Sequence, residues 1–217
     1  QEGPMASPQE WYREKMMERT VKALSSNYFD AHLFADRSSL IDSVMKYVSP
    51  GMKIGIGGSL SVRKIGLLER LKGIDVQILD HWKQGLTKED IGAIRLQQLT
   101  CDLFLSGANA ITERGDIVNI DGFGNRVNAM TFGPKKVIII AGYNKITPDI
   151  NLALDRIKRI AAPLNAKRLN LPLPCAETGY CHDCKSEARI CRVTSIIQRR
   201  PNGTDISVYL MNEELGL

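Results

Sequence analysis

The chain has 217 residues, of which 43% are hydrophobic and 24% are charged, and its formal net charge at pH 7 is +5. This is the composition of an ordinary globular protein of about one domain. The basic residues are dispersed and no aromatic-rich basic motif accompanies them, so nucleic acid is not an expected partner. No apolar run approaches the roughly 20 residues that span a bilayer, and the N-terminus lacks a signal-peptide pattern. We therefore expect a cytoplasmic protein without a membrane span that binds an anionic small molecule or an acidic protein.

Residues 1–10 are expected to comprise a disordered or tag-derived N-terminus and the start of a helix. Ser7, Pro8 and Glu10 predict where this helix begins. Ser caps a helix, Pro suits its first turn, and Glu three residues after the cap completes a capping box. Apolar residues at helical spacing extend the predicted helix to about residue 26.

Residues 11–170 are expected to form one α/β core. Apolar runs predict short strands at about 28–35, 52–56, 76–79, 103–105 and 137–140. Helical spacing of apolar residues predicts helices at about 38–48, 62–71, 88–99 and 148–162. Strands that alternate with helices predict a mainly parallel sheet with helices on both faces. The stretch between the last two strands is interpreted as a hairpin-like insertion.

Residues 171–217 differ in character and are expected to form an appendage packed on the core. The appendage begins with a loop that carries four of the five cysteines. Two predicted strands follow at about 193–198 and 206–210, separated by Pro201, Asn202 and Gly203. Because these three residues favour a turn, we predict an antiparallel β-hairpin added to one edge of the sheet.

A glycine-rich loop links the strand at 52–56 to the next helix. It contains Gly57, Gly58, Ser59 and Ser61. Glycines let the backbone approach a ligand closely, and a helix N-terminus offers unpaired N–H groups to an anion. The loop is neither a Walker A motif nor a complete dinucleotide fingerprint, so a tight structural turn explains it about as well.

A second group of small and amide-bearing residues lies between the strands at 103–105 and 137–140. It includes Gly107, Asn109, Asn119, Asp121 and Asn125. The carboxyl ends of parallel strands lie along one edge of a sheet, so this group and the first glycine loop are expected to face one crevice. A glycine-rich hairpin whose Asn residues adopt left-handed turns is the alternative. Lys145 follows closely and is either a cation for an anionic ligand or a solvated charge.

Three longer segments extend these patterns and begin at Gly55, Ser106 and Val208: GIGGSLSVRKIGLLERL, SGANAITERGDIVNIDGFGNRVNAMTFGPKKVIIIAGYNKI and VYLMNEELGL. Together they resemble the LUD-domain family of bacterial lactate-utilisation proteins, over about residues 11–217. The resemblance implies a fold like that of glucosamine-6-phosphate deaminase, ribose-5-phosphate isomerase and CoA transferases. It also implies iron–sulfur partner subunits in an L-lactate-oxidising complex, and a ligand pocket built from the two glycine-bearing groups.

Residues 107–122 are similar, more faintly, to methylthioribose-1-phosphate isomerase and to translation initiation factor 2B subunits. Asn109 stands where the isomerase has its catalytic Asp, and an amide cannot act as a general acid or base. This departure speaks against isomerase chemistry. Asp121 is then the remaining candidate for proton transfer, with a turn residue as the alternative.

Four cysteines lie within one short stretch: Cys175, Cys181, Cys184 and Cys191. Disulfides are rare in the cytoplasm, and thiolates at this density bind zinc or an iron–sulfur cluster. One close pair between two outlying cysteines is more typical of a [4Fe–4S] cluster than of structural zinc. Zinc and four reduced thiols are the alternatives.

One functional expectation and two alternatives follow. The expectation is an accessory or electron-transfer component in the oxidation of lactate or a related organic acid, with an anion bound at the sheet edge. The first alternative is a stand-alone enzyme acting on a sugar phosphate or on a CoA- or folate-type substrate. The second is a structural assembly subunit with a metal-stapled tail. The sequence leaves open whether the chain is itself an enzyme and whether it forms a homo-oligomer.

Overall fold

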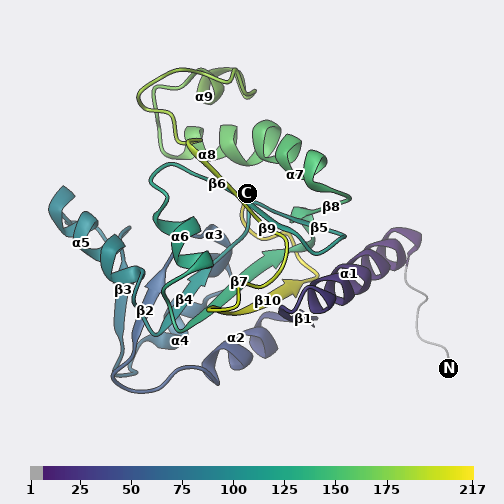
Figure 1. The fold of residues 1–217 in the computed structure, drawn as a ribbon, viewed down its shortest axis with the longest axis horizontal. Helices are drawn as coiled ribbons and strands as arrows, with labels where there is room; N and C mark the ends of the chain where they lie inside the picture. The colour runs from purple at the N-terminus through teal and green to yellow at the C-terminus, as the bar shows by residue number, and fades with distance from the viewer. Residues whose placement is uncertain (1–6) are drawn as a thin grey trace.

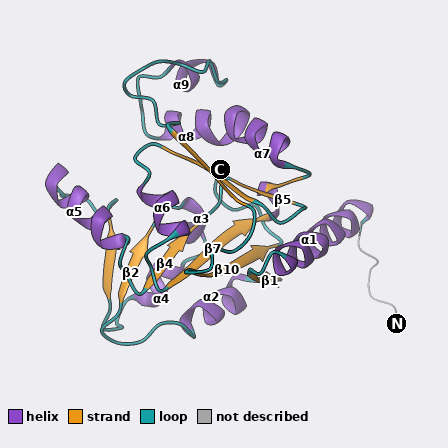
Figure 2. Ribbon diagram, viewed as in Figure 1, coloured by secondary structure: helices purple, strands orange, loops and turns teal. Residues whose placement is uncertain are grey.

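The computed structural model describes residues 7–217, and it confirms the predicted α/β fold. Six parallel strands form the main sheet in the order β1-β10-β7-β4-β2-β3 (Figures 1 and 2). The strands are β1 (Asp30–Phe34), β2 (Lys53–Ile56), β3 (Gln77–Asp80), β4 (Leu103–Ser106), β7 (Lys136–Gly142) and β10 (Asp205–Met211). Residues 1–6, most of the expected tag-derived segment, lie outside the described residues.

Helices cover both faces of this sheet. One face carries α1 (Pro8–Ser26), α5 (Lys88–Gln98) and α6 (Asn125–Thr131), and the other carries α2 (Arg37–Met45), α3 (Leu60–Lys64) and α4 (Leu67–Leu71). The central strand β7 contributes side chains to the cores on both faces of the sheet, because successive side chains of a strand point to opposite faces. Val137 and Ile139 pack with the first group of helices, whereas Ile138 and Ile140 pack with the second.

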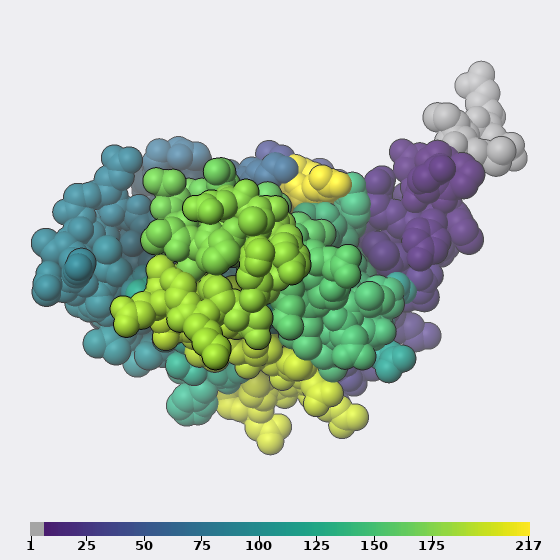
Figure 3. Space-filling view, turned by 90° about the horizontal axis from the view of Figure 1, so that it is seen from above, coloured from purple at the N-terminus to yellow at the C-terminus, as the bar shows by residue number. Residues whose placement is uncertain are grey.

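A smaller sheet lies beside the main one and has the order β8-β5-β6-β9. Its strands are β5 (Ala110–Thr112), β6 (Ile117–Asp121), β8 (Ile146–Thr147) and β9 (Val193–Ile197). The antiparallel pair β5–β6 confirms the hairpin-like insertion. One face of this sheet packs against a single helical run, made of α7 (Ile150–Arg156), a π-helical turn (Ile157–Ala161) and α8 (Ala162–Arg168). Seen from above in Figure 3, the green and yellow-green part of the chain covers the middle of the molecule.

The predicted C-terminal hairpin is wrong. Strand β9 pairs antiparallel with β6 in the small sheet, and β10 lies between β1 and β7 in the main sheet, parallel to both. The turn sequence at Pro201 separates these strands without pairing them. Strand β10 is buried at every residue from Ile206 to Met211, so its apolar character reflects an interior position rather than an edge.

Several helix boundaries follow the local chemistry of the sequence. The capping box at Ser7 and Glu10 is formed, with hydrogen bonds of 2.8 and 3.2 Å between the two residues. The helix predicted at 62–71 is instead two short helices, because Gly66 adopts a left-handed conformation (φ +84°) between α3 and α4. Within residues 7–217, no helix is both long and apolar enough to cross a membrane.

Candidate functional site

A cavity of about 220 Å³ lies at the carboxyl-terminal edge of the main sheet. It is lined by the loops that follow β2, β3 and β4, and by β6 with the start of α6. The π-helical turn, α8 and the last residue of the chain also line it. Ligands of open parallel sheets bind outside this edge, and π-helical turns are frequent at functional sites.

Most of the predicted site residues line this cavity: Gly57, Gly58, Ser59, Gly107, Asn109, Asp121, Asn125, Lys145 and Cys191. The two glycine-bearing loops meet because β2 and β4 are adjacent and parallel. A methyl group added at Gly107 would approach Ser59 Oγ to 2.7 Å. Ser61 and Asn119 are fully buried behind the cavity wall. The structure therefore gathers these residues in one place, and their binding roles remain predictions.

Gly58 shows why the first loop needs glycine. Its φ of +69° is a conformation that side-chain-bearing residues rarely adopt. A methyl group here would also lie 3.0 Å from the ring of Trp82, which lines the cavity. The loop thus brings bare backbone to the cavity beside an aromatic ring.

The amide side chains hold an arginine at the cavity. Asn109 Oδ1 accepts a hydrogen bond of 3.0 Å from Arg126 Nη2, and Asn119 Oδ1 accepts one of 2.7 Å from Arg126 Nη1. The backbone N–H of Asn109 donates to Asn119 Oδ1 at 3.0 Å, which links the two amides. Burial lowers the pKa of Arg126, and the nearby Asp121 carboxylate acts in the opposite direction. The amide cluster is thus the support for a fixed positive charge.

Asp121 is held in a turn. Its Oδ2 accepts hydrogen bonds from the backbone N–H groups of Arg126 (3.1 Å) and Val127 (3.3 Å), and its Oδ1 accepts one from Gly122 N–H (2.9 Å). A carboxylate engaged in this way stabilises the start of α6. The contacts favour the turn-residue alternative, and proton transfer by Asp121 stays a prediction.

Lys145 is a buried lysine at the cavity, with 5% of its surface exposed. Its Nζ donates to Ser61 Oγ at 3.0 Å and to the Ala108 carbonyl at 2.8 Å. Burial, followed by the positive charges of Arg156 and Arg126, lowers its pKa from 10.5 to about 7. The alternative of a solvated charge at Lys145 is therefore excluded, and its predicted role in binding an anion stays a prediction.

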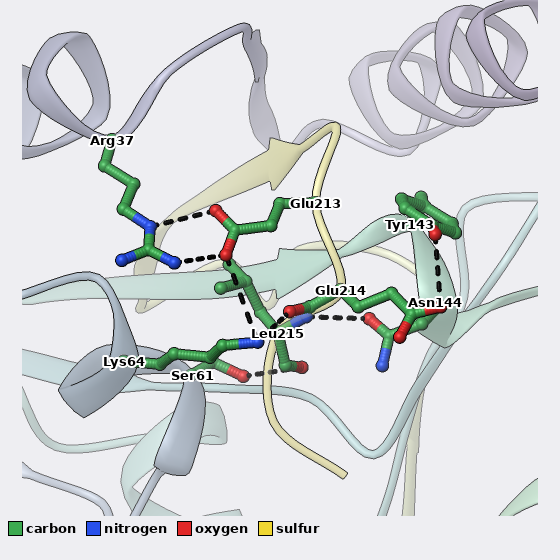
Figure 4. Close-up of polar contacts among 8 residues, drawn as sticks. All are labelled: Arg37, Ser61, Lys64, Tyr143, Asn144, Glu213, Glu214 and Leu215. Atoms are coloured by element: carbon green, nitrogen blue, oxygen red, sulfur yellow. Dashed lines mark hydrogen bonds and ion pairs between the residues drawn. The ribbon is translucent and has the colours of Figure 1, made fainter. Parts of the chain in front are cut away.

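Residues 212–217, here called the C-terminal strap, cross the edge of the sheet next to Lys145. Figure 4 shows how the strap is tied down. Ser61 Oγ donates to the Leu215 carbonyl at 3.2 Å, and Leu215 N–H donates to Asn144 Oδ1 at 3.0 Å. Glu213 forms an ion pair with Arg37 (Figure 4). The strap thereby brings Leu217 to the cavity wall.

The cavity carries a surplus of positive charge. Of its described lining residues, Arg95, Arg126, Lys145 and Arg168 are basic and Asp121 alone is acidic. Arg95 lies on α5, which was predicted as a helix, whereas Arg126 and Arg168 lie on α6 and α8, outside the predicted helices. His81 also lines the cavity, and burial followed by the charge of Arg95 lowers its pKa.

Two arginine–aromatic pairs at the cavity were not anticipated from the sequence. The Arg168 guanidinium lies 4.5 Å from the Trp82 ring centre, and the Arg95 guanidinium lies 3.8 Å from the Phe123 ring centre. These partners are separated by many residues in the chain, so no local pattern indicates them. The available signal was the dense polar stretch around residue 126, which contains one arginine among the amides.

The four clustered cysteines lie on the segment between α8 and β9, with Cys175 in the short helix α9 (Pro174–Thr178). All are partly exposed free thiols, and they lie near enough to one another that Cys181 and Cys184 raise the pKa values of Cys175 and Cys191. Burial is the larger cause and raises the pKa of Cys191 to about 11. The donors match a soft metal. In residues 7–217, however, no three His, Cys, Asp or Glu side chains are arranged to hold a metal ion.

A solved structure and a family profile match most of this chain. A crystal structure of a DUF162 family protein from Deinococcus radiodurans matches 96% of this chain and 99% of its own, with a TM-score of 0.52 and 10% identity. That likeness shows the fold. A crystal structure of eIF2B beta from Chaetomium thermophilum matches 54% of this chain and 44% of its own, with a TM-score of 0.35 and 13% identity. A search of curated proteins found no match. The sequence profile of the LUD domain matches residues 17–211, and the chain therefore belongs to the LUD-domain family.

Proposed function

We propose that this protein is an accessory or electron-transfer component in the oxidation of lactate or a related organic acid, and that it binds a small organic anion in the sheet-edge cavity. The LUD family is associated with lactate utilisation, which supports the general role. The finer proposal rests on the charge of the cavity, where three arginine side chains face a single carboxylate side chain among the described lining residues.

The physical argument is the cost of buried charge. Removing an ion from water is unfavourable unless an opposite charge or hydrogen bonds replace the lost solvation. Asp121 is already engaged by backbone N–H groups. A carboxylate or phosphate in the cavity would therefore offset the positive charges of Arg95, Arg126 and Arg168. The volume of about 220 Å³ suits a small ligand rather than a polymer.

The cysteine segment supports the electron-transfer part of the proposal. Cys191 lines the same cavity as the basic residues, so the thiol cluster adjoins the proposed anion site. After a rearrangement of this loop, the four thiolates would bind iron and sulfide or a single metal ion. Thiolate groups are the ligands that such centres require.

Anion binding is tested by titration calorimetry with L-lactate, pyruvate and inorganic phosphate. At least one anion should bind, and the neutral amide of lactate should not. Changing Arg95 to Met should weaken binding about tenfold or more, because a charge-assisted hydrogen bond contributes roughly 1.5–3 kcal/mol. Arg159→Met is the matched control, since Arg159 is exposed and pairs with Asp155 away from the cavity lining. Failure of all three anions to bind at millimolar concentration would contradict the proposal.

The redox part is tested separately. The protein is purified without oxygen, its visible absorption spectrum is recorded, and iron, zinc and sulfide are counted per chain. About four iron and four sulfide, lost in the Cys181→Ser, Cys184→Ser variant, would support an electron-transfer role. The control is Cys101→Ala, which changes the buried fifth cysteine outside the cysteine segment and should retain the metal. One zinc in a colourless protein would make the tail structural. No metal under these conditions would refute the cysteine-site proposal.

A further inference from the structure

The amine of Lys145 has an unusual set of hydrogen bonds for a lysine. Ser61 Oγ donates its single hydrogen to the Leu215 carbonyl, so it can only accept from Lys145 Nζ. The Ala108 carbonyl has no hydrogen and also accepts from Lys145 Nζ. These two acceptors account for the two N–H groups of a neutral amine. A protonated amine would have a third N–H, and among residues 7–217 only these two groups accept a hydrogen bond from Lys145 Nζ.

The charges around Lys145 agree with a neutral amine. Burial is the largest cause of its lowered pKa, and the charged groups of residues 7–217 that contribute, Arg156 and Arg126, are both positive. Arg156 is itself buried and donates to the carbonyls of Asn109 and Asn144 at 2.7 and 2.9 Å, which keeps its charge fixed nearby. A lysine desolvated beside other cations is the known environment of an activated amine nucleophile. Lys145 lines the cavity, so the lone pair of a neutral amine there would be near a bound ligand.

We propose that Lys145 is an amine nucleophile that forms an imine with a small carbonyl-bearing carboxylate, a 2-oxo acid, bound in the cavity. This inference rests on the anion site proposed above, where arginine side chains would hold the carboxylate and leave the adjacent carbonyl carbon for Lys145. The cavity would then bind the 2-oxo acid both through its arginine charges and through a covalent bond to Lys145.

The step balances without an oxidant or reductant. The Nζ lone pair forms a bond to the carbonyl carbon, and the π electron pair of the carbonyl moves to its oxygen. A proton passes from nitrogen to that oxygen to give a carbinolamine. The hydroxyl then leaves as water with a second proton from nitrogen, and a carbon–nitrogen double bond remains. One amine and one carbonyl thus yield one imine and one water.

The test traps the imine in the intact protein. Protein is incubated at pH 7 with pyruvate and sodium cyanoborohydride, which reduces imines to stable secondary amines, and the modified lysines are located by peptide mass spectrometry. An exposed lysine with an ordinary pKa of about 10.4 is unprotonated in a fraction on the order of 10⁻³ at this pH. Labelling of Lys145 should therefore exceed that of the exposed Lys158 by at least about tenfold.

Two variants and one competitor sharpen the result. Lys145→Arg retains a long basic side chain but lacks the amine nucleophile, so it should lose the dominant adduct, whereas Lys158→Arg should retain it. L-lactate, which carries the carboxylate without the carbonyl, should slow the labelling of Lys145. The wild-type peptide map does not depend on either variant folding.

The outcomes separate this inference from the anion site. Saturable labelling of Lys145 that L-lactate slows supports the inference. Calorimetric binding of pyruvate without an adduct on Lys145 overturns the imine and leaves the anion site standing. Labelling confined to exposed lysines overturns the inference as well. Absence of labelling, together with failure of L-lactate, pyruvate and phosphate to bind, overturns the inference and the proposed function alike.

Discussion

Arg126 and Lys145 reach the same cavity in different ways. Arg126 is held by Asn109 and Asn119, so its guanidinium keeps a set position and its charge. Lys145 is held by neutral acceptors with only cations nearby, so its charge is disfavoured. The chemical difference matters, because a guanidinium stays protonated in proteins whereas a lysine loses its proton when burial disfavours the charge. One residue therefore supplies fixed charge and the other supplies an amine.

The burial of Lys145 predicts how stability depends on pH. The folded-state pKa of about 7 lies below the unfolded value of 10.5, so between these pH values the unfolded chain binds a proton that the folded chain does not. The free energy of unfolding of the wild type should thus rise with pH across this window, by up to about 1.4 kcal/mol per pH unit from this group. Below pH 7 the burial of the charged amine disfavours folding.

Urea denaturation from pH 6 to pH 10 measures this effect. The wild type should gain stability relative to Lys145→Met as the pH rises. Lys158→Met, which changes an exposed lysine on the π-helical turn, should follow the wild type. Parallel curves for the wild type and Lys145→Met would show that Lys145 keeps its proton in the folded protein.

At the scale of elements, the C-terminal strap controls how the Lys145 site is assembled. It binds Ser61, the acceptor of one Lys145 hydrogen bond, and it passes over the end of β7 at Gly142. A methyl group at Gly142 would collide with the backbone oxygen of Glu213 and lie 2.6 Å from the backbone nitrogen of Leu215. Only glycine lets the strap lie this close to the strand end.

Gly142→Ala should therefore displace the strap and lower the free energy of unfolding by about 2 kcal/mol or more, as expected for overpacking. It should also reduce the labelling of Lys145 by pyruvate, because the Ser61 acceptor loses its fixed position.

Gly92→Ala is the control. Gly92 is exposed within α5, and no atom lies within 4 Å of the added methyl group. Helix propensity therefore predicts that the free energy of unfolding rises by up to about 1 kcal/mol. Thermal and urea denaturation measure the stability of the Gly142→Ala and Gly92→Ala variants. Equal stability of both variants would show that the strap moves without cost.

At the scale of the whole molecule, the last strand of the chain lies inside the main sheet. Strand β10 is inserted between β1 and β7, so segments from both ends of the chain meet in one sheet (Figure 1). Strand β9 belongs to the other sheet, and Val193, Thr194 and Ile196 of this strand are exposed. Side chains of the two strands should therefore differ strongly in their contribution to stability.

Leu210→Ala should lower the free energy of unfolding by about 2–5 kcal/mol. Leu210 is fully buried in the core on the face of the main sheet that α1 covers. Ile196→Ala in β9 should have a much smaller effect, since its side chain is 40% exposed. Equilibrium urea denaturation of both variants measures the difference. Similar effects at the two positions would argue that β10 occupies an edge, as the hairpin interpretation required.

Local patterns in the sequence predicted much of this molecule. The capping box at Ser7 and the alternation of apolar runs with helical spacing are short-range signals, and hydrogen bonding and burial act on them directly. The meeting of the Gly57 and Gly107 loops also followed from the sequence, because parallel strands place their carboxyl ends along one edge. The family was recognisable for the same reason, since its longest segments include these loops.

Tertiary structure alone decided the pairing of β10, the cation surplus of the cavity and the state of Lys145. The turn at Pro201 fits a hairpin, but burial of a fully apolar strand is more favourable between β1 and β7 than at an edge. Arg95, Arg126 and Arg168 lie far apart in the chain and converge only through packing. Whether a lysine carries its charge depends on the groups that surround it in space, and the residues beside it in sequence do not specify them.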